Sequence, residues 1–560
     1  MAQIITSKKA GPPRINRGNI FDFLQSNPNN VSPQDAAFIR VDGKQISRAQ
    51  LFSDARRLAY GLRHTLGLQP GSRIGIFSPN STAYPIAVHA GLCAGIVLVP
   101  LNAAYGSQEL VHPLHDADVQ YILCHHALLP VARQGLELAN IGPISANGRN
   151  RLWILDEDDE LKKGEQGEED VRILMSEDEL ETHKVVNPVE EDAFIAYSSG
   201  TSGRPKGVQL THSNMTSVTS AALITMGEDL THKDRIAAVL PFNHIFGLAK
   251  YVHFAVMVGA PAVVIPRYDL DVFCSVIEKQ KCTLAFVVPP ILVQLAKDPR
   301  ASKYDLSSLR YLFSGAAPLG SELSQEVEKK YPFLRVTQGW GLTETSPTAT
   351  VVSYKDYRKY MGSCGTLVAG LEARIVDDNG KDVGLEQGET GKPGELWIRG
   401  PTIMKGYLNN KEATDDCITP DGWFKSGDIA IMRDGYFWIV DRKKELIKFK
   451  GFQVAPAELE ALLLSHPKVA DVAVVGVYDD SQATELPKAY IVANAEGKRD
   501  GAEALSSEIV EWTAKKVANH MRLRGGVELI DVIPKSPSGK ILRRILRDAA
   551  AEKQKKNKKV

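Results

Sequence analysis

Short apolar runs alternate with longer amphipathic stretches over the first two thirds of the chain. Residues 47–66 carry apolar side chains at helical spacing, and Ser47 precedes them as a plausible N-cap. The apolar run at 73–77 is short enough for a buried strand and ends in the turn sequence 78–81. Similar runs, some with the loop that follows, occur at 94–100, 119–124, 193–197, 236–244, 284–289, 309–313 and 336–344. Strands that alternate with helices predict parallel βαβ units and therefore an α/β fold.

The pattern changes near residue 371. Short runs separated by Gly, Asp and Pro turns, which are typical of antiparallel strands, lie at 372–376, 394–398 and 436–440. We expect them to form a small β-barrel-like subdomain or a distorted sheet. Farther on, two helices and a strand are predicted, which together indicate a small α+β domain, at 456–464, 541–551 and 472–477.

These changes of pattern predict two domains. The N-terminal domain is expected to cover residues 1–440, with α/β regions at 1–190 and 191–370 and the β subdomain at 371–440. The C-terminal domain would cover residues 441–560. The charged segment 441–444 lies between domains of different pattern, which is a typical place for a hinge.

Composition and charge are those of an ordinary globular protein. Of the 560 residues, 43% are hydrophobic and 24% are charged, and 67 Lys and Arg balance 67 Asp and Glu, so nothing indicates a nucleic-acid partner. No run reaches the ~18 apolar residues of a membrane span, and the N-terminus lacks the apolar core of a signal peptide.

The six scattered cysteines are typical of reduced thiols, so we expect a cytoplasmic protein. A peroxisomal location is the alternative, although Lys558-Lys559-Val560 matches the Ser-Lys-Leu signal poorly. Two polar segments are expected to be structural. Cys124, His125 and His126 lack a second ligand pair at a spacing that suits a metal. Between residues 156 and 170, nine of fifteen residues are acidic, which predicts a solvated loop and not a metal site.

The strongest chemical signal lies at 198–207, Ser-Ser-Gly-Thr-Ser-Gly-Arg-Pro-Lys-Gly, directly after the strand-like run 193–197. Its glycines allow sharp turns and close approach to a ligand, and its N–H groups and hydroxyls can donate to anionic oxygens. Arg204 and Lys206 add positive charge. The stretch predicts a polyphosphate-binding loop but not a Walker loop, because Gly207 follows the lysine where that motif has Ser or Thr.

With the residues that follow it, Val208-Gln209-Leu210-Thr211-His212, this loop closely resembles the phosphate-loop signature of the adenylate-forming enzymes. That superfamily contains acyl- and aryl-CoA synthetases, peptide-synthetase adenylation domains and beetle luciferases. The resemblance covers residues 20–548 and is closest to the 4-coumarate–CoA ligase-like branch, which the segments 314–320 and 448–458 nearly match. It implies an α/β N-terminal domain, a mobile C-terminal domain, and the use of ATP, Mg²⁺ and CoA.

The resemblance also implies a nucleotide site built from several loops. The implied contacts are Ser198, Ser199, Gly200, Thr201, Ser202, Gly203, Lys206, Gly315, Ala316, Gln338, Gly339, Trp340, Gly341, Thr343, Asp428, Arg442 and Lys444. The family usually has tyrosine at this position. Trp340 keeps the aromatic face that would stack on adenine but lacks the phenol hydroxyl. Asp428 and Arg442 would contact the ribose, and Mg²⁺ would be bound by Thr201 and Glu344.

Catalytic roles follow from the same resemblance. Lys540, on the loop 534–540, would stabilise the charge that develops between the carboxylate and the α-phosphate. His244 would lie beside the reacting carboxylate as an oriented donor. Lys448 and Gln453 would serve thioester formation after the C-terminal domain has swung about the hinge.

The acid would lie against Phe246, Ala249, Phe313, Gly339 and Thr348. Plant coumarate ligases often have a lysine at the position of Phe313, where it faces the phenol hydroxyl. Because this pocket is expected to be apolar, a medium-chain fatty or simple aryl acid is favoured over coumarate, with broad acceptance by size.

The predicted reaction is ATP-dependent activation of a carboxylic acid as acyl-AMP, followed by transfer to CoA, with a small-molecule acid, ATP and CoA as partners. Loading of a carrier protein and luciferase-like oxidation of the adenylate are alternatives that use the same motifs. A nonenzymatic nucleotide or acyl binder is the alternative of a different class. The presence of Lys206, Glu344, Asp428 and Lys540 argues against it.

Overall fold

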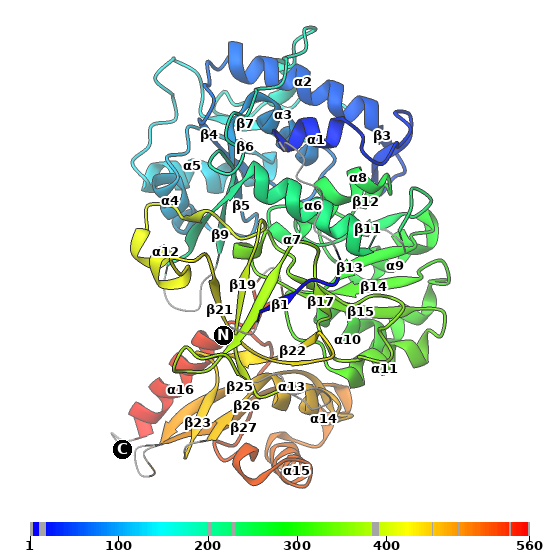
Figure 1. Ribbon diagram of the computed structural model, residues 1–560, viewed down its shortest axis with the longest axis vertical. Coiled ribbons are helices and arrows are strands. Elements are labelled where there is room, and N and C mark those ends of the chain that lie inside the picture. Colours follow the sequence, from blue (N-terminus) through cyan, green and yellow to red (C-terminus); the bar gives the residue numbers. More distant parts are fainter. Residues whose placement is uncertain are drawn as a thin grey trace.

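The computed structural model describes residues 4–9, 18–198, 204–226, 230–383, 391–450, 452–479, 482, 484–536 and 539–557. A large N-terminal part, coloured blue to yellow in Figure 1, has a smaller C-terminal domain, coloured orange and red, at one end. Both parts combine helices with sheets, so the predicted α/β class and the small C-terminal α+β domain are confirmed.

Two large sheets form the centre of the N-terminal part. The first has the order β20 (Gly406–Tyr407), β10 (Lys206–Thr211), β9 (Asp192–Ser198), β5 (Val97–Leu101), β4 (Arg73–Phe77), β6 (Tyr121–Cys124), β7 (Leu152–Ile154) and β8 (Glu169–Asp170). The second has the order β17 (Thr366–Leu367), β16 (Thr350–Val351), β15 (Arg335–Trp340), β14 (Tyr311–Ser314), β13 (Leu284–Val287), β11 (Ile236–Ala238), β12 (Ala262–Val264), β2 (Ala36–Arg40) and β3 (Gln45–Ser47). Their central strands run parallel, as predicted.

Helices lie between these strands along the chain. Those of the N-terminal part are α1 (Ile20–Gln25), α2 (Arg48–His64), α3 (Ala83–Ala94), α4 (Ser107–Asp116), α5 (Leu129–Leu138), α6 (His212–Met226), α7 (Ile245–Gly247), α8 (Ala255–Val258), α9 (Leu270–Gln280), α10 (Pro289–Lys297), α11 (Ser321–Lys330) and α12 (Lys411–Cys417). The helix predicted at 47–66 is α2, and the Ser47 hydroxyl accepts the N–H of Gln50 as its cap. Within the described residues, no helix combines the length and the apolar character needed to cross a bilayer.

The third sheet is antiparallel, with the order β1 (Ile5–Thr6), β18 (Glu372–Val376), β19 (Gly394–Arg399), β21 (Phe424–Arg433) and β22 (Tyr436–Arg442). Among the described strands this sheet is open, with β1 and β22 at its edges. Of the two expected forms, it is therefore the distorted sheet and not a closed barrel. Figure 1 shows the N-terminal β1 beside strands that come more than 360 residues later.

The C-terminal domain follows β22. Its strands and helices are β23 (Ile447–Phe449), β24 (Phe452–Val454), α13 (Pro456–Leu464), β25 (Val469–Asp479), β26 (Thr484–Ala493), α14 (Ala495–Arg499), α15 (Ala502–Ala514), β27 (Val527–Leu529) and α16 (Arg543–Asn557). The strands β25, β26 and β27 form one sheet, and β23 and β24 form a hairpin.

The sheets do not follow the predicted division at residue 190. β9 and β10 belong to the first sheet, whereas β2 and β3 join the second. An apolar run indicates a buried strand but not its neighbours, because pairing depends on long-range packing that periodicity does not encode. Likewise β22 runs through the predicted boundary at 440 and ends at Arg442, which pairs with Asp428 of β21.

The acidic segment 156–170 also differs from its prediction as a solvated loop. Asp156, Glu168 and Asp170 are buried. The Arg133 guanidinium donates to both oxygens of Glu168, at 2.6 and 2.8 Å, and Arg172 pairs with Asp170 at 2.7 Å. A run of charged residues predicts exposure only when no partner is available. Here one partner, Arg133, lies on α5, and the other, Arg172, closely follows the acidic segment.

Candidate active site

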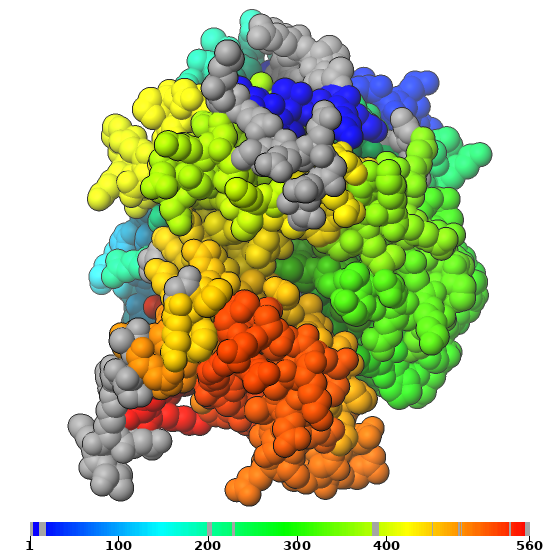
Figure 2. Space-filling model, turned by 60° about the horizontal axis from the view of Figure 1, so that its bottom comes forward, coloured from blue at the N-terminus to red at the C-terminus, as the bar shows by residue number. Residues whose placement is uncertain are grey.

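A cleft of about 880 Å³ lies at the carboxyl ends of β9, β14 and β15, which is where open parallel sheets collect ligands. Residues of the C-terminal domain line it as well, because the two parts of the chain are in contact (Figure 2). The predicted site residues that line this cleft are Ser198, Lys206, His244, Phe246, Phe313, Gly315, Ala316, Gly339, Trp340, Gly341, Thr343, Glu344, Thr348, Asp428, Arg442, Lys444 and Lys540.

Other predicted residues lie elsewhere. Ser199, Gly200, Thr201, Ser202 and Gly203 are outside the described residues. Gln338 lines a second cleft of about 1140 Å³, between α10 and the C-terminal domain, and its side chain donates to the carbonyl of Leu319. The two clefts share residues of the segment 339–342, so they adjoin.

Lys448 and Gln453 face each other across the exposed hairpin of β23 and β24. They are not among the residues that line the first cleft. The backbone N–H of Lys448 donates to Glu485 at 2.7 Å, which fixes the hairpin to β26. This arrangement separates the residues predicted for thioester formation from those predicted for adenylation.

Glu344 lies just after β15 and meets residues from two other strands. Its Oε1 accepts the Tyr407 hydroxyl at 2.8 Å and the Ser198 hydroxyl at 3.5 Å. Lys206 places its Nζ 4.6 Å from the centroid of the Tyr407 ring. Burial and the charge of Glu344 raise the pKa of Tyr407 well above its ordinary value, so this hydroxyl stays protonated and donates.

Tyr407 belongs to no motif of the sequence that indicates a nucleotide site. It joins the site because β20 pairs with β10, which brings residue 407 beside residue 208. β20 is only two residues long, and its partner lies about 200 residues earlier, so no local pattern could have predicted the contact.

Trp340 connects the predicted adenine and ribose contacts. Its indole N–H donates to Oδ2 of Asp428 at 2.7 Å, while the Arg442 Nε lies 3.6 Å from Oδ1. Burial is the main cause of a raised pKa at Asp428, and the charge of Arg442 opposes it. The indole therefore replaces the expected phenol as a polar group and orients the carboxylate.

Lys540 enters the cleft on a tight loop. The backbone N–H of Lys540 donates to the Ser536 hydroxyl at 3.2 Å, and Gly539 has φ +80°, where a side chain would be strained. Burial and the charge of Arg442 lower the pKa of Lys540 to about 8, against the raising effects of Glu445, Asp428 and Glu344. The same ammonium contributes to the lowered pKa of His244, which lines the same cleft.

His244 caps α7 and lines the cleft. Its Nδ1 accepts the N–H of Phe246 at 3.2 Å, so in the neutral ring the proton is on Nε2. Burial, with a smaller effect of Lys540, lowers the pKa of His244 to about 4, and the imidazole is neutral at physiological pH. It thus offers one N–H donor to a ligand in the cleft.

Aromatic rings close one end of the cleft. Phe246 and Phe313 line it, with ring centroids 6.4 Å apart, and both contact Phe286 of β13. A Cβ on Gly315 would lie 2.8 Å from the Phe246 ring, and one on Gly339 would lie 2.5 Å from the Phe313 ring. Glycine is therefore required where the rings approach the backbone. Ala249 is buried in the adjoining helix and does not line the cleft.

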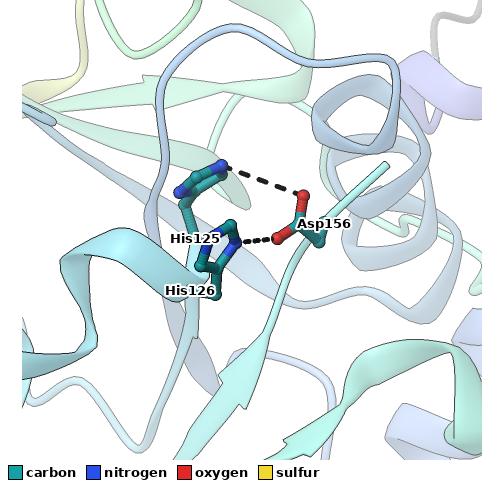
Figure 3. Close-up of side chains that lie close together, drawn as sticks. All are labelled: His125, His126 and Asp156. Carbon is teal, nitrogen blue, oxygen red and sulfur yellow. Dashed lines mark hydrogen bonds and ion pairs between the residues drawn. The ribbon is translucent and has the colours of Figure 1, made fainter. Parts of the chain in front are cut away.

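A separate polar cluster lies at the ends of β6 and β7, where His125, His126 and Asp156 meet (Figure 3). His125 Nε2 is 3.8 Å from Asp156 Oδ1, and His126 Nδ1 contacts Oδ2. His125 Nδ1 already accepts the N–H of Ala127, so its ring proton is on Nε2, the atom that would have to bind a metal. The geometry favours a carboxylate that accepts the N–H of His126, with the N–H of His125 nearby, over a metal site.

Comparisons with known proteins identify the family of the chain. The model of the AMP-binding enzyme family matches residues 26–408, and that of the AMP-binding enzyme C-terminal domain matches residues 458–540. A probable 4-coumarate–CoA ligase 1 of Dictyostelium discoideum is 35% identical, over 94% of each chain. A 4-coumarate-CoA ligase 1 of Narcissus pseudonarcissus is 37% identical, over 90% of each chain.

Solved structures share the fold of the chain. The anthranilate CoA ligase AuaEII in complex with anthranoyl-AMP superposes with a TM-score of 0.83 at 25% identity, covering 96% of this chain and 98% of that one. ATP-bound MatB from Rhodopseudomonas palustris gives a TM-score of 0.81 at 25% identity, covering 96% and 99%. With both family models matched in order over most of its length, the chain belongs to the AMP-binding enzyme family.

Proposed function

We propose that the protein is an AMP-forming acid–CoA ligase, which activates an aryl or medium-chain carboxylic acid as its acyl-adenylate and transfers the acyl group to CoA. The observation that carries this proposal is the convergence of Lys540, His244, Asp428 and Glu344 on one cleft, from segments far apart in the chain. The relatives named above as 4-coumarate and anthranilate CoA ligases support the reaction and the acid class.

In the first half-reaction, the acid carboxylate would attack the α-phosphate of ATP and release pyrophosphate. The Lys540 ammonium would stabilise the negative charge of attack, and the Nε2–H of His244 would orient the carboxylate. Asp428 would accept ribose hydroxyls with the oxygen atoms that Trp340 and Arg442 hold in place.

Mg²⁺ fits the polar group around Glu344. The carboxylate is a hard oxygen ligand, and the Ser198 hydroxyl lies 3.5 Å away, beside the phosphate loop. Thr201, the second predicted ligand, lies outside the described residues. When bound, Mg²⁺ would neutralise phosphate charge. Chelation with EDTA is expected to stop pyrophosphate release, and added Mg²⁺ to restore it.

In the second half-reaction, a thiol would attack the adenylate and release AMP. Lys448 and Gln453 lie on the exposed hairpin, so a swing of the C-terminal domain about residues 441–444 would bring them to the cleft. This proposal treats residues 1–440 and 441–560 as the moving units, with the hinge beginning in the last two residues of β22. The second cleft offers the thiol a path to residues 339–342.

We also propose a cytoplasmic location, because all six cysteines are free thiols.

The test separates the two half-reactions. Lys540→Ala is expected to lower adenylate formation at least ~100-fold, while supplied acyl-adenylate and CoA still give thioester. Lys448→Ala is expected to slow thioester formation more than adenylate formation. Both are measured with MgATP, with and without CoA, against acids from short to long fatty acids and from benzoate to cinnamates.

Each outcome decides a point. Equal losses in both half-reactions would reject the assigned roles. Pyrophosphate release without thioester would move the acceptor to a carrier-protein thiol, and no release with any acid would reject the ligase.

A further inference from the structure

A lysine lies buried behind the aromatic end of the cleft. Lys250 is 1% exposed and belongs to the π-helical segment Leu248–Phe254, which continues α7 directly after His244 and Phe246. π-helical turns are rare and occur often at functional sites. In sequence, Lys250 is a single charge in the otherwise apolar run Leu248-Ala249-Lys250-Tyr251-Val252.

Three phenyl rings surround its ammonium group. The Nζ lies 5.4 Å from the centroid of Phe254, 5.7 Å from Phe286 and 5.9 Å from Phe313. Phe286 and Phe313 are paired across β13 and β14. Because Phe313 also lines the cleft, one ring lies between the ammonium and the space proposed for the acid.

Aromatic rings alone offset the cost of burying this ammonium only in part. Neither an ion pair nor a hydrogen bond to Nζ occurs within the described chain, and burial is the sole cause of a pKa lowered to about 7. Transfer of an unpaired charge into an apolar setting costs free energy that cation–π contacts offset only in part. A methionine would fill the same volume without that cost, so packing gives no reason for a lysine here.

The position also suits the length of an acid. Lys250 follows His244 by six residues of helix, three in α7 and three in the π-helical segment. His244 would lie at the reacting carboxylate, so Lys250 lies toward the opposite end of an aryl or medium-chain acid.

We propose that Lys250 is a specificity-determining residue that selects acids with an oxygen acceptor at the end remote from the reacting carboxylate. The acceptor is a phenol or hydroxyl oxygen, or the oxygen of a second carboxylate. A turn of the Phe313 or Phe246 ring would let this oxygen reach Nζ. The inference rests on the proposed ligase function, and it replaces the expectation of a wholly apolar acid pocket.

The experiment compares matched acids in wild-type enzyme and in Lys250→Met. One pair is 4-hydroxycinnamate and cinnamate, and the other is adipate and hexanoate, so the two pairs distinguish a neutral from an anionic oxygen. In at least one pair, the ratio of kcat/KM for the oxygen-bearing acid to that for its partner is expected to fall at least 30-fold. Lys250→Gln, which keeps an N–H donor, should retain part of the preference.

Tyr251→Phe is the matched control, because it removes a neighbouring buried polar atom that donates to the carbonyl of Phe286 at 3.0 Å. It should change both acids of a pair by the same factor. A ratio that moves less than threefold in both pairs for Lys250→Met would overturn the inference and leave the ligase function intact. If the Lys250 variants do not fold, the preference of the wild-type enzyme between the two acids of each pair tests the inference. A wild-type preference, in both pairs, for the acid that lacks the remote oxygen would overturn the inference. Wild-type enzyme that releases no pyrophosphate with any acid rejects the ligase function itself.

Discussion

At the scale of single residues, the site depends on ionisation states that its surroundings set. Burial and the charge of Arg442 lower the pKa of Lys540 from 10.5 to about 8, and burial lowers that of His244 to about 4. At pH 7 the lysine is therefore mostly an ammonium ion, and the histidine is neutral. These are the forms that the proposed adenylation step needs.

The pH dependence of adenylation follows from Lys540. Its active ammonium form is lost as the pH rises through about 8, so kcat/KM for ATP should be level below that pH and fall about tenfold per unit above it. Pyrophosphate release at saturating acid, measured from pH 6 to 10, tests this. An arginine stays protonated over this range, so Lys540→Arg, whatever its rate, should lack the descending limb. The same limb in that variant would mean that another group titrates.

At the scale of elements, the loop that carries Lys540 docks on the start of α10. An added Cβ at Gly539 would lie 3.2 Å from Cγ2 of Val288, in a backbone conformation with φ +80°. Gly526 has φ +81° in the same domain, but a Cβ there would meet nothing within 4 Å. The two glycines therefore separate backbone strain from docking.

Gly539→Ala should lower pyrophosphate release at least tenfold, because strain and the contact with Val288 both displace the loop. Thioester formation from supplied acyl-adenylate should change less than threefold. Gly526→Ala adds the same backbone strain, about 1 kcal/mol, but brings no new side-chain contact. It should slow neither half-reaction as much as Gly539→Ala slows pyrophosphate release. Equal losses in the two variants would show that docking of the loop does not matter.

At the scale of the whole molecule, the two domains meet in an arrangement that suits adenylation and not thioester formation. Lys540 is in the cleft, whereas Lys448 and Gln453 are on the exposed hairpin. The contact includes Lys297 of α10, whose Nζ donates to the carbonyl of Leu464 at 2.6 Å. A Cβ at Gly320 would lie 3.2 Å from that of Ala461 across the same contact.

A disulfide between residues 320 and 461 should lock this arrangement, since a small shift gives the Cβ separation of about 3.5–4.5 Å that disulfides need. The oxidised double variant Gly320→Cys, Ala461→Cys should still release pyrophosphate but form thioester at least tenfold more slowly. Dithiothreitol should restore the rate, and each single variant serves as the control for oxidation. Equal thioester rates in the oxidised and reduced forms would reject domain movement.

The sequence by itself determined the α/β class, the change to antiparallel strands near residue 371 and the motifs that mark the site, because periodicity, turn residues and local motifs are properties of neighbours along the chain. Helix α2 with its Ser47 cap and strand β4 are examples. Only the tertiary structure decided which strands share a sheet. The bond of Tyr407 to Glu344, the bond of Trp340 to Asp428 and the aromatic surroundings of Lys250 were decided in the same way. The two hydrogen bonds join residues 63 and 88 positions apart, and Phe313 lies 63 positions from Lys250. These contacts depend on packing between elements, which no local pattern records.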